Sequence, residues 1–484
     1  MALHSERPLF PSPLSSTFLE TNDAPVESQI PSVRDFISRA RTQKTRLAEE
    51  IAQLQSRLNV LYLEHDELDA QILQHEGVLS PLRRFPTEIL SLIFTFAFTR
   101  DPTRSFKQDL EPWIVSAVCA RWRAVVLLSP TFWTTINSYD SHFTLSNLTT
   151  QLSRSGNLPL TLHFTYEVNN SAAFHLLLQH CARWKTIHLT ISQELYSSIQ
   201  RTSPHFPVLR KVKLEIHFDG IHSGFSDVFS NAPELEDFFV DGYPYSSTIA
   251  LDLPWPQLTK YSSANQEWGQ LSTLASAVHL VECTLDMSEE EKPANLDIPV
   301  MLFPTLLRLS VSHHTLLAYF QAPVLAELYC HSYEYRSALD EHALLRWLPR
   351  TLRRLVLESP DRDMVPSPYL DLISIVQALP KLEALGCFDP CSLDNISRFL
   401  GSAAARSPAL ERLSIVIQIG TAGLFEILEA VDWENVRLRK LVFQLSGTKP
   451  ILVPESLRDR GVELQGSAGL FYDSLVPENL RLKR

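Results

Sequence analysis

The sequence predicts an α/β protein in which a helical N-terminal part precedes a solenoid of stacked strand-and-helix repeats. Three observations predict this fold. Apolar residues recur at alternating steps of three and four over residues 32–76, which indicates a long helix. Residues 81–136 contain a helix that is apolar almost all round. From residue 158 a leucine-based pattern returns about every 25 residues, as in stacked repeats.

Residues 1–31 are rich in Ser, Pro and Thr and are predicted to be a disordered tail. The predicted helix over 32–76 begins with Ser32 as its N-cap, and Gly77 and Pro81 stop it. About five heptads give it the seam of a coiled coil. The seam residues are Ile37, Ala40, Lys44, Leu47, Ile51, Leu54, Leu58, Leu61, His65, Leu68 and Ile72. Two interpretations stay open: the helix folds back onto the next segment, or it is a stalk that makes a homodimer.

The segment 81–136 carries more apolar surface than a small unit can bury. In the helix that begins after Pro86, the only polar residues on an otherwise apolar surface are Thr87, Glu88, Ser91 and Thr95. A unit of about 50 residues buries only about 60% of its chain surface by itself. Either the rest of the chain or a partner protein must therefore cover this helix.

The order of residues in this segment resembles the F-box, the module by which substrate receptors dock the small Skp adaptor of cullin–RING ubiquitin ligases. The run P-T-E-I-L-S-L-I-F at 86–94 and V-C-A-R-W-R at 118–123 carry the resemblance. Phe85 stands where the family usually has Leu, and residues 99–112 lengthen the connection between the first two helices. The resemblance implies that the adaptor is contacted by Leu82, Pro86, Ile89, Leu90, Ile93, Phe94, Val118, Cys119 and Trp122.

A repeat array is predicted over residues 158–465, followed by a C-terminal tail at 466–484. The template P-x-L-x-x-L-x-L ends in a short strand whose alternate residues enter a common core. Its clearest copies are 206–214, 232–240, 303–311, 322–330, 379–387 and 407–415. Weaker copies fall at 182–189, 255–262, 276–283, 350–357 and 436–443. The array resembles the irregular leucine-rich repeats found behind F-boxes in many fungal proteins, which implies parallel strands of one sheet.

Composition and charge narrow the function classes. The chain has 484 residues, 45% of them hydrophobic, and a formal net charge of −12, which argues against a nucleic-acid binder. Six scattered cysteines indicate buried thiols of a reducing compartment. We find no secretion signal or membrane span in the sequence and expect an intracellular protein of the cytoplasm or nucleus.

We find no catalytic motif and expect no enzyme, cofactor or metal site. The phosphate-cradling, zinc-protease and serine-hydrolase patterns are absent from the sequence. Cys387 and Cys391 lack the second pair that a zinc site needs. His313 and His314 are expected to be surface or loop residues rather than ligands, and Trp255, Trp268 and Trp347 are expected to pack in the core.

The resemblance implies a substrate-recognition subunit of a Skp–cullin–F-box ubiquitin ligase, whose repeats bind a protein target that the sequence does not identify. The alternative is a scaffold that uses the coiled coil and the repeats for binding without joining a ligase. Ile89, Leu90, Ile93 and Phe94 form two adjacent apolar stripes, one of which can face the second helix. In the first case the other stripe should be partly exposed in the isolated chain. Complete burial of these residues would favour the scaffold.

Overall fold

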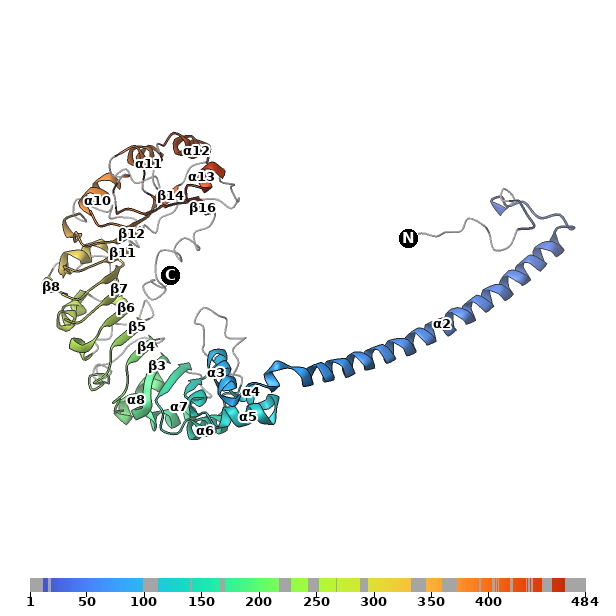
Figure 1. The fold of residues 1–484 in the computed structure, drawn as a ribbon, viewed down its shortest axis with the longest axis horizontal. Coiled ribbons are helices and arrows are strands. Elements are labelled where there is room, and N and C mark those ends of the chain that lie inside the picture. Colours follow the sequence, from blue (N-terminus) through green and yellow to red (C-terminus); the bar gives the residue numbers. More distant parts are fainter. Residues whose placement is uncertain are drawn as a thin grey trace. The chain divides into compact units, whose positions relative to one another are not determined.

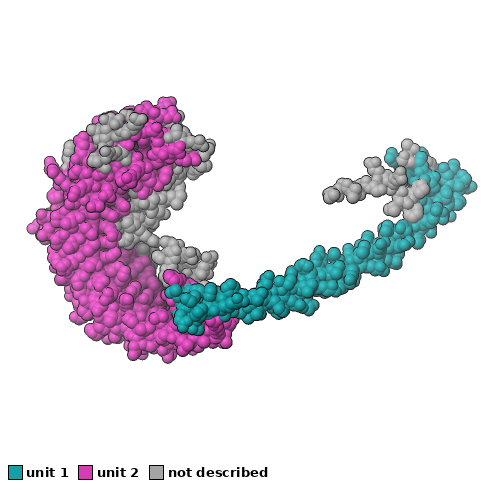
Figure 2. Space-filling model, in the orientation of Figure 1, with its two compact units in different colours: residues 1–94 teal, residues 95–484 magenta. Residues whose placement is uncertain are grey.

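The computed structural model describes most of the chain. The described residues are 12–15, 19–98, 112–139, 142–165, 170–216, 228–242, 252–266, 268–287, 295–331, 345–358, 372–390, 393–402, 405, 407, 409–417, 421–431, 433, 436, 438–445 and 455–465. They form two compact units, Met1–Phe94 and Thr95–Arg484 (Figure 2). The predicted tail at 466–484 and most of the insert at 99–112 lie outside the described residues, as do residues 1–11 and 16–18 of the predicted N-terminal tail.

The first unit is dominated by one continuous helix, α2 (Ile30–Leu79). It begins two residues before the predicted start and runs through Gly77, because a glycine inside a helix weakens it without ending it. The predicted N-cap is wrong: Gln29 occupies that position, and Ser32 lies inside the helix, where its Oγ donates to the Gln29 carbonyl over 2.8 Å. The helix ends where Ser80, the residue before Pro81, turns to an extended conformation.

Short helices follow α2. They are η1 (Pro81–Arg83), α3 (Thr87–Phe98), α4 (Pro112–Val118), α5 (Ala120–Leu127) and η3 (Pro130–Trp133). The expected second helix through Val118 and Trp122 is divided in two at Cys119, which has extended backbone (φ −158°, ψ 166°). In η3, the indole of Trp133 donates to the Val126 carbonyl over 3.0 Å and thereby fixes α5 to the start of the sheet.

The second unit is built on a single parallel sheet of fourteen described strands that lie side by side in sequence order. They are β1 (Thr135–Asn137), β2 (Leu160–Thr165), β3 (Trp184–Ile191), β4 (Lys211–Ile216), β5 (Asp237–Gly242), β6 (Lys260–Gln266), β7 (Glu282–Met287), β9 (Arg308–Val311), β11 (Glu327–His331), β12 (Arg354–Glu358), β13 (Ala384–Pro390), β14 (Arg412–Ile417), β15 (Lys440–Leu445) and β16 (Val462–Gln465). The prediction that 206–214, 303–311 and 407–415 end in parallel strands of one sheet is confirmed by β4, β9 and β14.

The sheet begins earlier than the sequence indicated. β1 lies at 135–137, within the segment assigned to the preceding helical unit, and pairs in parallel with β2. Its three residues carry a single core side chain, Ile136, so the leucine template could not find it.

The connections run along one side of the sheet (Figure 1). Near the two ends of the sheet they are mostly α-helices: α6 (Leu145–Arg154), α7 (Ser171–Leu178), α8 (Gln193–Thr202), α10 (Leu372–Ala378), α11 (Leu393–Leu400), α12 (Thr421–Glu429) and α13 (Glu455–Arg458). In the middle they are 3-10 helices: η6 (Trp255–Gln257), η7 (Trp268–Ser276) and η8 (His314–Tyr319). A separate pair of short strands, β8 (Met301–Leu302) and β10 (Phe320–Gln321), lies in this middle part.

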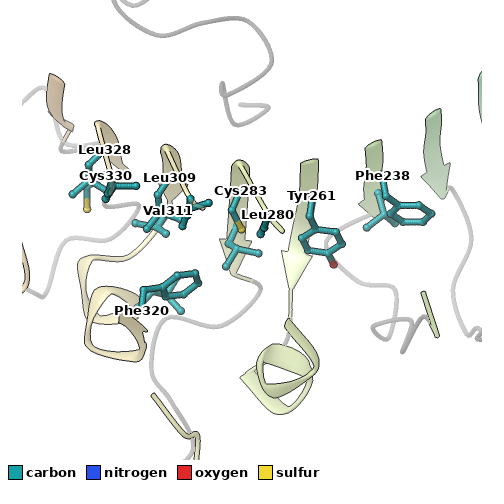
Figure 3. Close-up of a cluster of buried hydrophobic side chains, with 14 of the residues drawn as sticks. Phe238, Tyr261, Leu280, Cys283, Leu309, Val311, Phe320, Leu328 and Cys330 are labelled. Carbon is teal, nitrogen blue, oxygen red and sulfur yellow. The ribbon is translucent and has the colours of Figure 1, made fainter. Parts of the chain in front are cut away.

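The hydrophobic core is continuous from Ile136 to Val462, as stacked repeats require. The template leucines and the cysteines at the same positions enter it from successive strands (Figure 3). Trp255 and Trp268 pack in the core as expected, whereas Trp347 is exposed. His313 lies in the loop between β9 and η8, but its side chain is buried there, and burial lowers its pKa.

Candidate functional site

Helix α3 has two apolar faces, one buried and one exposed to solvent. Leu90 and Phe94, one turn apart, are buried. Ile89, Leu92, Ile93 and Phe96 are 42, 52, 37 and 73% exposed. At 3.6 residues per turn these four positions lie on one side of the helix. We call Ile89, Leu92, Ile93 and Phe96 the exposed stripe.

The approach to α3 is also open to solvent. Pro86 directly precedes the helix and is exposed, and its carbonyl accepts the first helical hydrogen bond from Leu90 N at 3.1 Å. Leu82, in η1, is 40% exposed. Because proline has no N–H to lose and has its φ fixed, Pro86 prepares the start of the helix without a side-chain cap.

Helices α4 and α5 in the second unit present apolar residues of their own. Ile114 and Val118 lie one turn apart on α4 and are both exposed, while Val115 is buried. Cys119 caps α5, because its Sγ accepts a hydrogen bond from the Trp122 N–H over 3.4 Å. The Cys119 thiol is exposed and Trp122 is half-buried. Leu128, just after α5, is 82% exposed.

The predicted contact residues therefore divide into accessible and buried ones. Seven of the nine are exposed or half-buried in this chain, and Leu90 and Phe94 are not accessible. The expected partial exposure of the stripe is found in Ile89 and Ile93. The sequence reasoning missed Leu92 and Phe96, which have the same spacing on the helix as Ile89 and Ile93 and could have been included on that ground.

A second feature is a row of charged side chains on the sheet face opposite the core. Lys211, Asp237, Lys260, Glu282, Arg308, Glu327 and Arg354 stand opposite one another in register on seven consecutive strands, β4 to β12. We call these seven residues the charge row. Positive and negative residues alternate along it, so each interior residue has neighbours of the opposite sign.

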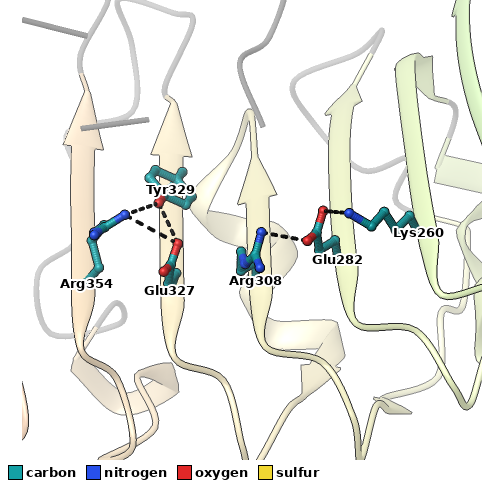
Figure 4. Close-up of polar contacts among 6 residues, drawn as sticks. All are labelled: Lys260, Glu282, Arg308, Glu327, Tyr329 and Arg354. Carbon is teal, nitrogen blue, oxygen red and sulfur yellow. Dashed lines mark hydrogen bonds and ion pairs between the residues drawn. The ribbon is translucent and has the colours of Figure 1, made fainter. Parts of the chain in front are cut away.

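The shortest ion pairs of the charge row meet at Glu282 (Figure 4). Glu282, whose side chain is only 6% exposed, contacts Arg308 over 2.6 Å and Lys260 over 2.9 Å. Glu327 accepts a hydrogen bond from the Tyr329 hydroxyl over 2.7 Å, and Arg354 donates to that hydroxyl over 3.3 Å. Burial is the main cause of a pKa of Tyr329 above its ordinary range, so the phenol stays neutral and can donate.

The alternation ends at β13, where Ala384 stands opposite Arg354. Arg412 on β14 and Lys440 on β15 continue the same register position. The next strand supplies an acid, since Lys440 contacts Glu463 over 2.8 Å. This end of the face is thus more basic than the charge row itself.

The described part of the chain holds no group of three or more His, Cys, Asp or Glu side chains placed to bind a metal ion. Cys391, the partner considered for Cys387, lies outside the described residues. Cys283, Cys330 and Cys387 are buried thiols of the core. No helix among the described residues has the length and apolar character needed to cross a membrane.

Comparison with known proteins gives little similarity in sequence. No family model matches the chain, and no curated protein matches it. Among solved structures, the chain is similar to one from yeast, from the crystal structure of the Rad7 and Elc1 complex, with 15% sequence identity and a TM-score of 0.32. That likeness covers 86% of this chain and 96% of the other.

Proposed function

We propose that this protein is a substrate receptor of a Skp–cullin–F-box ubiquitin ligase. Helix α3 docks a Skp-family adaptor, and the repeat array binds the protein to be ubiquitinated. The observation that carries the proposal is the exposed stripe of α3, together with the F-box-like order of residues around it. Four large apolar side chains exposed together on one short helix are typical of a surface that binds another protein.

Covering the stripe would contribute apolar binding energy to an adaptor complex. Fully burying one such side chain contributes about 1.5–3 kcal/mol, and each residue of the stripe begins roughly half exposed. Ile89, Leu92, Ile93 and Phe96 together therefore contribute on the order of 4 kcal/mol. Leu82 and Pro86 extend the same accessible surface toward the start of the helix.

The resemblance implies that Leu90 and Phe94 contact the adaptor, but we assign them a structural role instead. Because both are buried within this chain, they hold α3 in place and leave contact with the adaptor to the exposed stripe. Val118, Cys119 and Trp122 remain accessible for contact. The receptor supplies no chemistry of its own: it brings the target near a transferable ubiquitin, and the gain is one of proximity and orientation.

A scaffold outside any ligase is the second candidate. The burial of Leu90 and Phe94 favours it, because this part of the apolar surface of α3 is used inside the chain. The scaffold gives no role to the exposed apolar residues of the same helix. Binding to a Skp-family adaptor separates the two candidates.

The test is co-purification of the full chain with a Skp-family adaptor. The variant Ile89→Asp/Ile93→Asp should lose the adaptor, since two carboxylates would be buried in an apolar interface. Trp347→Asp places one carboxylate on an exposed apolar residue of the repeat array, and this variant should retain the adaptor. Circular dichroism confirms that both variants fold. Adaptor binding that survives the double substitution, or that is absent from the wild type, contradicts the proposal.

A further inference from the structure

We propose that α2 is the arm of an antiparallel homodimer, in which two copies of the helix pair about a two-fold axis between Ala52 and Gln53. This goes beyond the adaptor-docking function and does not depend on it. The occupant of the exposed seam is a second copy of this chain, and the charges that flank the seam fix the direction and register of the pair.

The seam of α2 has no cover in the described structure. No residue of this 50-residue helix is buried, and the seam residues Ile51, Leu54 and Leu58 are 54, 65 and 50% exposed. The helix is about 75 Å long at 1.5 Å per residue. Because helices in proteins owe most of their stability to a packed apolar face, a partner along the length of the seam is required.

A parallel pair in register is opposed by the polar residues of α2. With Lys44, Ile51 and Leu58 at heptad position a, a parallel pair would place Lys44 against Lys44 and His65 against His65. In the flanking positions g and e, Glu64 would face Asp69 of the second copy. No flanking pair would join opposite charges, so the parallel pair has only repulsive charge contacts.

An antiparallel pair centred between residues 52 and 53 removes these conflicts. Each layer then joins position a of one copy to position d of the other. The six layers are Ile37–Leu68, Lys44–Leu61, Ile51–Leu54, Leu58–Leu47, His65–Ala40 and Ile72–Val33. Every layer contains an apolar side chain, Lys44 is separated from its copy, and the imidazole of His65 meets the small Ala40.

The flanking charges select this register. Glu50 faces Arg57 of the second copy and Arg34 faces Asp69, and the two-fold axis repeats each pair. Arg41 faces Tyr62, a cation over an aromatic ring. All six of these side chains are exposed in the structure. A shift by one heptad would instead place Glu50 against Glu64 and Arg57 against Arg57.

The first test is a charge swap measured by sedimentation equilibrium on the full chain. Arg57→Glu turns two attractive pairs into repulsive ones and should weaken self-association roughly tenfold. Adding Glu50→Arg restores both pairs and should recover the wild-type dissociation constant. Arg46→Glu makes the same charge change outside the seam and should leave self-association unchanged. A wild-type chain that stays monomeric through the micromolar range, or a double variant no better than Arg57→Glu, overturns the proposal.

The second test reads direction by cross-linking with a short bismaleimide. The variant Ala48→Cys/Gln55→Cys uses flanking positions that face each other in the antiparallel pair and keeps the register-selecting charges. It should give a covalent dimer whose linked peptides join position 48 of one copy to position 55 of the other. The matched variant Glu50→Cys/Gln55→Cys places its thiols in flanking positions that meet only in a parallel pair, and it should give no linkage between 50 and 55. Mass spectrometry separates these linkages from those of the native Cys119. A dimer joined through 50 and 55 overturns the antiparallel arrangement.

Discussion

Gly461 offers a sharp test of the packing at the C-terminal end of the sheet. It lies in the turn between α13 and β16 with φ +80°, where side chains are rarely tolerated. A Cβ added there would lie 2.0 Å from the backbone oxygen of Arg439 and 3.0 Å from its carbonyl carbon. The Gly461 carbonyl also accepts a hydrogen bond from Leu441 N over 2.9 Å, which joins this turn to β15.

Gly461→Ala should therefore combine three costs. The left-handed backbone contributes about 1–2 kcal/mol. Displacing a backbone carbonyl contributes about 1–3 kcal/mol, as overpacking does. Loss of the bond from Leu441 N adds about 1 kcal/mol. We expect the local free energy of unfolding to fall by roughly 3–6 kcal/mol.

Two other glycines separate these costs. Gly156 has φ +56° and no atom within 4 Å of an added Cβ, so Gly156→Ala should lose only the backbone part, about 1–2 kcal/mol. Gly269 has neither a positive φ nor a close neighbour, and Gly269→Ala should change stability by less than about 0.5 kcal/mol.

Hydrogen–deuterium exchange is the suitable assay, because repeats of a solenoid can open locally and exchange reports the protection of each repeat separately. In Gly461→Ala, peptides covering β15 and β16 should lose protection while those covering β2 to β4 keep it. The reasoning is refuted if Gly461→Ala and Gly156→Ala lower protection at their own sites equally, because the contact with Arg439 would then cost nothing.

Two further predictions concern the sheet face opposite the core. Glu282→Gln leaves Lys260 and Arg308 without their shared carboxylate and should lower the free energy of unfolding by about 1–3 kcal/mol in urea. Glu411→Gln removes an exposed ion pair with Arg439 and should lower it by less than about 0.5 kcal/mol. Equal losses in the two variants would contradict the importance of burial. Burial raises the pKa of Asp286 from 3.8 to about 6, so the folded state holds this proton more tightly than the unfolded one, and stability falls as pH rises between about 4 and 6. Asp286→Asn should remove that part of the pH dependence and raise the melting temperature at pH 7; a melting temperature that differs from the wild type equally at pH 4 and pH 7 would argue against it.

The repeats could be predicted because each strand carries its signal in three consecutive core positions. In β4 and the residues before it, Leu209, Val212 and Leu214 are separated by charged residues, and the pattern alone places them in a common core. A strand with fewer core residues could not be predicted: β1 has only Ile136. The 3-10 helices between the strands could not be predicted either, because a short apolar run fits one turn of a 3-10 helix or of an α-helix.

The faces of α3 show where pattern reasoning ends. Leu90 and Ile93 are equally apolar, so the sequence could not say which stripe is buried and which stays accessible. The break between α4 and α5 at Cys119 could not be predicted either. Ser and Asp are typical N-cap residues, whereas a cysteine whose thiol accepts a backbone N–H is not recognisable as a cap from the sequence. Helix α2, by contrast, could be predicted to within three residues of each end, because ten regular steps of three and four are typical of an amphipathic helix and of little else.

The alternating charge row also constrains how such an array can change in length over evolution. Its charge pattern repeats every two strands, whereas the structural unit repeats every strand. Loss of the single unit that contains Glu282 would bring Lys260 beside Arg308, and like charges in facing positions destabilise neighbouring strands. Loss of two successive units would bring Lys260 beside Glu327 and keep the alternation. Recombination within β4 to β12 should therefore be tolerated more readily when it adds or removes repeats in pairs.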